Sequence, residues 1–157
     1  MKLSTKGRYA MIALADMARE GAVHGAPRLV SLHEVAERQD ISLAYLEQLF
    51  VKLRRAGIVE SVRGPGGGYR LAKPVHEIRV CNILAAVDET MDALERGAGA
   101  HGGTGGTEAQ VLTDRLWESL SAHVYVFLHQ TRLSDITEGA LAPCPAVPAF
   151  IQMVDAE

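Results

Sequence analysis

A helix pattern followed by a glycine-rich segment, between residues 41 and 71, constrains this fold more than any other feature of the chain. The helix begins at Ser42, whose hydroxyl can accept a hydrogen bond from an unpaired backbone N–H of the first turn. Apolar residues then follow at spacings of three and four and predict one buried face: Leu43, Leu46, Leu49, Phe50 and Leu53. Gly57 suits the left-handed position just past a helix end, so we expect the helix to stop there.

The glycine-rich segment is predicted to be the loop of a β-hairpin. Residues 58–62 have the β-branched content of a strand, and residues 69–71 return as its partner. Residues 63–68 (Arg-Gly-Pro-Gly-Gly-Gly) can neither hold a helix nor pack a core, so they project as a loop. A helix with amide and cationic side chains beside a basic-tipped hairpin is typical of a winged helix, a unit that binds DNA.

The residues before Ser42 complete a helix-turn-helix. Ser31 and Glu34 have the spacing of a capping box, in which each side chain pairs with the backbone N–H of the other. The helix that they open ends near Arg38, and only residues 39–41 separate it from the next helix. Two helices joined so briefly match a helix-turn-helix, whose second helix enters the major groove.

A further helix is expected to begin at Ser4 or Thr5 and to run to about Arg19. Its predicted buried side consists of Tyr9, Ala10, Ile12, Ala13, Leu14 and Met17. Lys6 and Arg8 lie in its first turn, where the helix dipole disfavours cations. We therefore expect phosphate contacts from both, although simple solvation explains them equally well.

The exposed face of the helix after Ser42 carries the candidate DNA contacts. Glutamine pairs with adenine through two hydrogen bonds, so Gln48 is the first candidate for base reading. Glu47 can accept from a cytosine amino group or penalise wrong sites, although a surface ion pair with Arg54 or Arg55 explains it equally well. The candidate phosphate and wing contacts are Ser42, Tyr45, Lys52, Arg55, Arg63, Gly66 and Gly67. The alternative for the wing glycines is a plain flexible turn.

Charge indicates which half of the chain meets DNA. The 157 residues have a formal net charge of −3, yet residues 1–80 hold 13 Lys and Arg against 8 Asp and Glu, and residues 81–157 hold 3 against 11. This basic first half suits a polyanion, unless the asymmetry is chance. No apolar run approaches the ~20 residues of a membrane span, and the N-terminal residues lack the apolar core of a secretory signal. We therefore expect a cytoplasmic protein without membrane contact.

The second half is predicted to hold a long helix that pairs with a second copy of the chain. Residues 80–87 suit a short buried helix in which Cys81 is a small core residue. After a loop of Gly, Ala and Thr, helical periodicity resumes from 108 to about 133. Its apolar stripe consists of Val111, Leu112, Leu116, Trp117, Leu120, Val124, Phe127 and Leu128. A single chain of this size has little left to cover the stripe, so a homodimer would bury it on a two-fold axis.

The predicted fold is mainly α (α+β), with a winged helix-turn-helix domain and a long C-terminal dimerisation helix. The expected domains are the DNA-binding domain over 1–80, a sensor loop with the dimerisation helix over 81–135, and a tail over 136–157. An enzyme is disfavoured, because the sequence offers no nucleophile–base set and the wing glycines lead into a strand and not into a phosphate-binding helix.

Several sequence segments resemble one known family. The IscR-type iron–sulfur cluster regulators are similar to this chain over roughly residues 2–135, on the segments 3–10 (LSTKGRYA), 41–50 (ISLAYLEQLF), 61–69 (SVRGPGGGY) and 86–89 (AVDE), and on Leu116-Trp117. The resemblance implies a homodimeric winged-helix transcription factor, a repressor of iron–sulfur assembly or iron-homeostasis genes that binds palindromic promoter DNA. It also implies that Ser42, Glu47, Gln48 and Arg63 match DNA-contacting positions.

The predicted sensor departs from the family pattern. Family members hold the cluster with three loop cysteines and a histidine near the start of the long helix, but residues 96–110 lack cysteine and Asp114 takes the histidine position. The remaining candidate ligands are Cys144, His101, His123 and His129. Because cluster iron accepts thiolate and imidazole together, we expect an iron–sulfur cluster, 2Fe–2S, with non-standard ligation. His123 and His129 are roughly 240° apart around a helix, so they would share a site only through the second subunit or the tail.

Other sensors stay open. Cys144 lies between two prolines on an extended segment, which suits a redox-sensitive thiol as well as a ligand. The histidines could hold bare ferrous iron or zinc. A regulator without a cofactor, controlled by a partner protein on the acidic half, is the remaining alternative.

Overall fold

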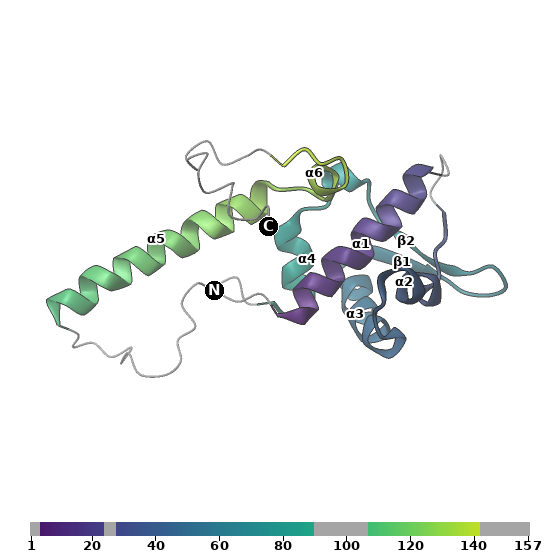
Figure 1. Ribbon diagram of the computed structural model, residues 1–157, viewed down its shortest axis with the longest axis horizontal. Coiled ribbons are helices and arrows are strands. Elements are labelled where there is room, and N and C mark those ends of the chain that lie inside the picture. Colours follow the sequence, from purple (N-terminus) through teal and green to yellow (C-terminus); the bar gives the residue numbers. More distant parts are fainter. Residues whose placement is uncertain (1–3, 24–27, 90–106, 142–157) are drawn as a thin grey trace, which may run out of the picture.

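Three helices build the helix-turn-helix and its support (Figure 1). The computed structural model describes residues 4–23, 28–89 and 107–141. Helix α1 spans Thr5–Val23, α2 spans Leu32–Gln39 and α3 spans Leu43–Arg55. Helix α1 ends about one turn later than expected. At its start the Ser4 hydroxyl donates to the Glu89 carboxylate, so a distant residue takes part in ordering this end of the helix.

Local capping fixes the starts of α2 and α3. The Ser31 side chain accepts from the Glu34 N–H at 3.2 Å, and the Glu34 carboxylate accepts from the Ser31 N–H at 2.8 Å, which confirms the capping box. Ser42 accepts from the Tyr45 N–H at 3.4 Å, as expected. Between the two helices Asp40 adopts a left-handed conformation with φ of 51°, which Asp tolerates better than most residues. The short turn between α2 and α3 is therefore explained by local residues, the left-handed Asp40 and the cap at Ser42.

The wing is a two-stranded antiparallel hairpin. Strand β1 spans Val59–Val62 and β2 spans Gly68–Leu71, with Val59 opposite Leu71 and Val62 opposite Gly68. Val30, before α2, forms a single antiparallel bridge to the wing, in which Val30 and Tyr69 exchange backbone hydrogen bonds at 2.8 and 2.9 Å. The loop between the strands projects beyond the helices (Figure 1).

The apolar face of α3 lies at the centre of the core. Leu46, Leu49, Phe50 and Leu53 are at most 3% exposed. Leu43 was expected on this face but is 37% exposed, because as the first residue of the helix it lies beyond the edge of the core. Ile12 was expected to be buried in α1 and is 40% exposed.

Short elements after the wing close this core. The 3-10 helix η1 spans Val75–Glu77 and α4 spans Val80–Ala86, with Ile83 and Leu84 buried. Helix α6, Leu133–Thr137, returns Leu133 to the same core. We call this unit, residues 4–23, 28–89 and 131–141, the head.

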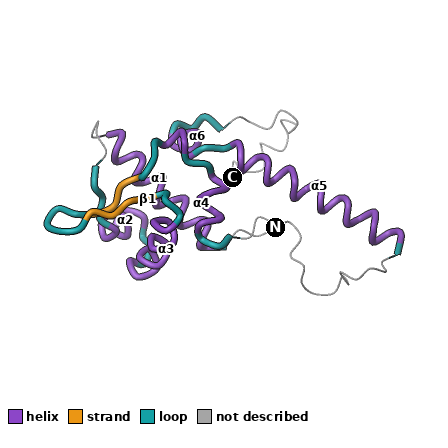
Figure 2. The backbone as a smooth tube through the Cα atoms, turned by 180° about the vertical axis from the view of Figure 1, so that it is seen from behind, coloured by secondary structure: helices purple, strands orange, loops and turns teal. Residues whose placement is uncertain are grey.

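Helix α5, Glu108–Gln130, projects away from the head (Figures 1 and 2). It packs against α4, and the chain after it is tied to the head where the Val80 N–H donates to the Thr131 carbonyl at 3.0 Å and the Leu133 N–H to the Ile78 carbonyl at 2.9 Å. None of the α5 residues is buried. The predicted fold class is confirmed, and no helix in the described ranges is long and apolar enough to cross a membrane.

Candidate nucleic-acid interface

The exposed face of α3 carries the predicted base-reading residues. Glu47 and Gln48 are both exposed, while the opposite side of the same helix is closed against the core. Within the described ranges neither side chain has a hydrogen bond or ion pair, and Arg54 donates instead to the Ser61 hydroxyl at 3.3 Å. The alternative in which Glu47 pairs with Arg54 or Arg55 is therefore not the arrangement found. An amide and a carboxylate side by side on an exposed helix face can read donors and acceptors of base edges.

The predicted phosphate contacts on α3 differ in their surroundings. Arg55 is exposed at the helix end, where its charge also suits the helix dipole. Tyr45 is half-buried, with its ring edge-on to that of Tyr9 at 5.6 Å, so part of this side chain supports the α1–α3 contact. Lys52 pairs with the carboxylate of Asp88, a residue 36 positions away. The sequence pattern did not predict that Lys52 and Asp88 lie close together.

The wing loop has a defined backbone. Gly64 and Gly66 have φ of 103° and 73°, which other residues rarely adopt. The Gly67 N–H donates to the Gly64 carbonyl at 2.9 Å, and a Cβ on Gly67 would lie 2.3 Å from the Val62 carbonyl oxygen. Hence the glycines are required by the turn itself, beyond any contact with DNA. Arg63 is exposed at the base of this loop.

The start of α1 is held against the end of α4. The Glu89 carboxylate accepts from the backbone N–H groups of Ser4 and Gly7, both at 3.1 Å, and from the Ser4 hydroxyl. Burial raises the pKa of Glu89, but these hydrogen bonds and the charge of Lys6 outweigh it and leave the pKa below its ordinary value. A Cβ on Gly7 would lie 2.9 Å from both Glu89 and Leu84, so glycine permits the approach. Lys6 and Arg8 are exposed in this first turn.

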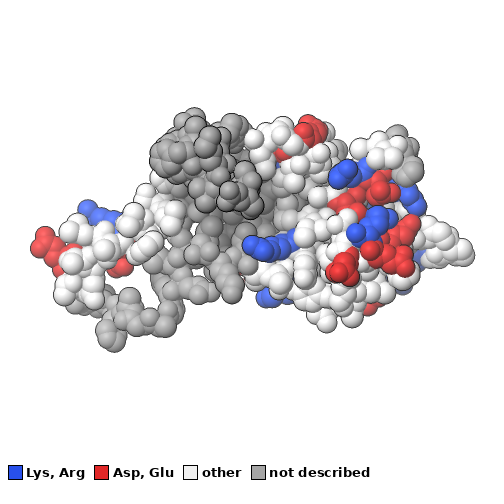
Figure 3. Space-filling model, viewed as in Figure 1, with Lys and Arg blue, Asp and Glu red and all other residues white. Residues whose placement is uncertain are grey.

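The charged residues of the head are partly paired among themselves. Asp16 accepts two hydrogen bonds from Arg38, at 3.0 and 2.6 Å, and Arg28 pairs with Glu20 and Glu34. Figure 3 shows acidic and basic side chains intermixed on one face of the head. Some of the basic residues counted in the first half of the chain are therefore paired with acidic side chains of the head. Fewer cations are left for DNA than the charge of this half suggests.

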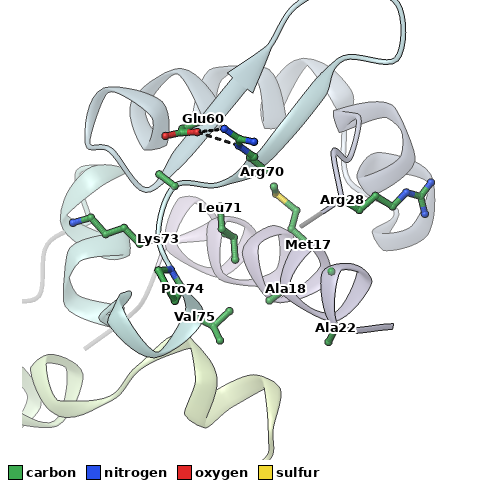
Figure 4. Close-up of a pocket in the computed structure, with 12 residues that line it drawn as sticks. Met17, Ala18, Ala22, Arg28, Glu60, Arg70, Leu71, Lys73, Pro74 and Val75 are labelled. Carbon is green, nitrogen blue, oxygen red and sulfur yellow. Dashed lines mark hydrogen bonds and ion pairs between the residues drawn. The ribbon is translucent and has the colours of Figure 1, made fainter. Parts of the chain in front are cut away.

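An open cleft of about 650 Å³ lies between α1 and the strand β2 (Figure 4). Its apolar lining includes Met17, Leu71 and Val75. Arg70, which also lines it, donates to the Glu60 carboxylate at 2.9 and 3.0 Å. The predicted DNA contacts contribute no residue to the cleft lining, so we assign it no part in DNA binding.

The candidate metal ligands do not come together in the described part of the chain. His123 is exposed, with Nδ1 2.7 Å from the Ser119 carbonyl oxygen. The Nδ1 of His129 lies 3.5 Å from the Cys81 Sγ, and its ring stacks on Tyr125 at 5.7 Å. His101 and Cys144 lie outside the described residues. Among the residues described, no three His, Cys, Asp or Glu side chains are grouped to hold a metal ion.

Cys81 is buried at 4% exposure, as expected for a core residue. Its contact with His129 joins α4 to α5 across 48 residues, and sequence reasoning missed it. No local signal could have shown it, because the pairing depends on how α5 returns to the head.

Comparisons with known proteins agree with this architecture. A model of the Rrf2 family, described as iron-dependent transcriptional regulators, matches residues 3–139. The HTH-type transcriptional regulator IscR of Cereibacter sphaeroides is 67% identical over 155 residues, which cover 99% of each chain. IscR of Vibrio campbellii is 48% identical over 87% of this chain and 77% of its own.

Solved structures give the same result. The global cysteine regulator CymR of B. subtilis has a TM-score of 0.72 and 28% identity, and covers 88% of this chain and 98% of its own. T. potens IscR has a TM-score of 0.68 and 31% identity over 96% of each chain. The resemblance inferred from the sequence is thus confirmed, as is the prediction of a transcriptional regulator in place of an enzyme. This chain belongs to the Rrf2 family of iron-dependent transcriptional regulators.

Proposed function

We propose that this chain binds palindromic promoter DNA as a homodimer and represses iron–sulfur assembly or iron-homeostasis genes. The observation that carries the proposal is the exposed pair Glu47 and Gln48, on a helix whose other face is buried and beside a wing with Arg63 at its base. In this arrangement α3 enters the major groove and Gln48 pairs with an adenine. Arg63 lies close to the minor groove, where a narrow groove attracts an arginine.

The homodimer is supported by the exposed apolar residues of α5. Eight of them are each at least 42% exposed: Val111, Leu112, Leu116, Trp117, Leu120, Tyr125, Val126 and Phe127. An apolar surface this extended on one helix is typical of an interface. A second copy of α5 would cover it and place two α3 helices on a palindrome, since a two-fold dimer reads a two-fold site.

The DNA-binding proposal is tested with fluorescence anisotropy on a palindromic promoter duplex and a scrambled duplex. We expect Gln48→Ala to reduce discrimination between them by about 1–3 kcal/mol, because one bidentate base contact is lost. Arg63→Ala should weaken binding to both duplexes. Gln130→Ala and Arg19→Ala, which remove exposed side chains from α5 and α1, serve as matched controls. Affinity that is independent of salt, or equal for both duplexes, would contradict the proposal.

For the cofactor we propose an iron–sulfur cluster with non-standard ligation by Cys144, His101, His123 and His129. The described residues of one subunit do not form such a site by themselves, because His123 and His129 contact different partners. Ligation therefore requires residues outside the described ranges or a second copy, and we derive no mechanistic step from the cluster.

Oxygen-free purification tests the cofactor. Visible absorbance with iron and sulfide supports the cluster, and Cys144→Ala should abolish all three. Thr113→Ala is the control, because Thr113 is exposed on α5 and its hydroxyl donates to the Ala109 and Gln110 carbonyls of its own helix, away from both histidines. Colour retained in Cys144→Ala removes Cys144 from the ligand set. A colourless dimer that binds DNA fully supports the alternative regulator, which responds to a thiol switch or to a partner protein.

A further inference from the structure

Asp88, at the end of α4, forms an ion pair with a lysine of α3, the helix proposed to bind DNA. Asp88 follows α4 directly and forms an ion pair with Lys52 of α3. Its side chain is 69% exposed and that of Lys52 is 39% exposed, so water and ions reach both. Lys52 lies on α3 four residues after Gln48, which is about one helical turn. The ion pair thus borders the surface proposed to meet DNA.

The turn that carries Asp88 is fixed by its neighbours. The Glu89 N–H donates to the Leu84 carbonyl at 3.0 Å, while the Glu89 carboxylate accepts from Ser4 and Gly7 of α1. Asp88 itself has φ of 55°, a conformation that Asp and Asn tolerate. This anchoring holds the backbone of Asp88 beside α3, which places its carboxylate within reach of Lys52.

A carboxylate on an exposed lysine resembles the contact that a DNA phosphate would make. The hydrogen bond and the charge of Lys52, together with the charge of Lys6, keep the pKa of Asp88 below its ordinary value, so this carboxylate is ionised at neutral pH. Exposed pairs of this kind are weak, because water screens them. A phosphate that approaches α3 can therefore displace Asp88 from Lys52.

We propose that Asp88 is an intramolecular competitor of the DNA backbone, which holds Lys52 in the free protein and releases it to a phosphate in the complex. The proposal rests on the proposed function, since it requires α3 to bind DNA. Competition at a phosphate contact changes affinity for every duplex alike, because phosphates carry no sequence information. Asp88 would then set how tightly the head binds DNA in general, and Gln48 would set which sequence it prefers.

The test compares Asp88→Asn with Asp40→Asn on the full chain. Asp40 is an ideal control because it is also exposed, has φ of 51° and lies beside α3, yet it has no ion pair within the described ranges. Each substitution removes one negative charge from the head and keeps a residue that accepts the left-handed conformation. Dissociation constants are measured by fluorescence anisotropy for the palindromic and the scrambled duplex over a series of salt concentrations.

We expect Asp88→Asn to tighten binding to both duplexes by the same factor, roughly two- to fivefold, which is the range of an exposed ion pair. Asp40→Asn should have a smaller effect. Lys52→Gln should weaken binding to both duplexes and reduce the slope of log K against log salt by about 0.9, the value for one phosphate contact. In the Lys52→Gln background, Asp88→Asn should have no more effect than Asp40→Asn.

Three results would overturn the proposal while the proposed function stands. Equal effects of Asp88→Asn and Asp40→Asn would show that Asp88 acts only as a distant charge. Weaker binding by Asp88→Asn, with a thermal melt like that of the wild type, would show that Asp88 positions Lys52 for DNA. A full gain from Asp88→Asn in the Lys52→Gln background would show that Lys52 is not involved. If the wild-type chain bound neither duplex, the proposed function itself would be wrong.

Discussion

The helices of the head and helix α5 are both amphipathic, but only the helices of the head have their apolar residues covered within the same chain. Leu14, Leu46 and Phe50 have no exposed surface, whereas Leu116 and Trp117 of α5 are 59% and 43% exposed. The patterns that predict the two kinds of helix are alike in sequence. Periodicity therefore identifies the apolar face of a helix and leaves open which part of the same or another chain covers it.

The two regions also differ in how they are joined to the rest of the molecule. The head is closed by contacts between distant segments, such as Glu89 with Ser4 and Leu133 with Ile78. Helix α5 is attached near its end, where Thr131 and Cys81 connect it to the head. We therefore expect the head to be stable by itself, and α5 to gain most of its stability from a second copy. Four experiments test this contrast.

The largest difference is expected in the free energy of unfolding when a large aromatic residue is removed from each region. Phe50→Ala should lower the free energy of unfolding by about 3–5 kcal/mol, because Phe50 is fully buried and its ring packs edge-on to Tyr69 at 5.1 Å. Trp117→Ala should change it by less than about 1 kcal/mol, because Trp117 is 43% exposed in the single chain. Urea unfolding followed by circular dichroism measures both in a Leu116→Asp background, so that self-association contributes to neither value. Similar losses for the two variants would refute the contrast.

Self-association is expected to depend on α5 alone. Leu116→Asp should raise the dimer dissociation constant at least about 100-fold, because the two-fold interface would bury a carboxylate without a partner in each copy. Sedimentation velocity over a range of protein concentrations measures this change. Glu37→Lys, at an exposed position of α2 in the head, is the control and should leave the dimer intact. A wild-type chain that sediments as a monomer would remove the basis of both the dimer and the palindromic site.

The local elements of the head could be predicted from the sequence because each depends on residues close together. Ser31 with Glu34, Ser42 and the left-handed Gly57, with φ of 69°, act within a few positions of their own element. The exposed positions of Gln48 and Arg63 followed from the same patterns.

Contacts between distant segments could not be predicted in this way. The pairs Lys52–Asp88 and Cys81–His129 are separated by 36 and 48 residues, and no local pattern indicates which side chains the fold brings together. The exposure of Leu43 was missed for a related reason, since the apolar stripe of α3 does not show where the supporting core ends. The candidate DNA contacts were therefore accessible to sequence reasoning, whereas the side chains that regulate them were not.

The capping boxes at the starts of α2 and α5, formed by Ser31 with Glu34 and by Thr107 with Gln110, offer a smaller contrast between the regions. Ser31→Ala should lower the free energy of unfolding of the head by about 1 kcal/mol, because the Glu34 N–H loses its acceptor. Thr107→Ala removes the equivalent acceptor for Gln110 in α5 and should leave the unfolding of the head unchanged. Amide hydrogen exchange should show faster exchange only in the first turn of α5. A loss of head stability in Thr107→Ala would mean that α5 folds as one unit with the head.

The smallest effect concerns pH, and it separates the same two capping boxes. Hydrogen bonds from the Ser31 backbone and side chain, and then the charges of Arg28 and Arg38, hold the pKa of Glu34 below its ordinary value of 4.5. A carboxyl group with a lowered pKa stabilises the fold above its unfolded value and loses this contribution as the pH falls through the folded value. The wild type should therefore be more stable than Glu34→Gln at pH 6. The difference in the free energy of unfolding should be less than about 1 kcal/mol, because the Glu34 side chain is 37% exposed, and it should shrink below pH 4.5.

In α5 the matching residue is Gln110, which does not titrate, so Gln110→Glu should make the first turn of α5 sensitive to acid without changing the head. Urea unfolding between about pH 3 and pH 6 measures the first effect, and a difference that stayed constant over this range would show that Glu34 acts through its shape and not through its charge.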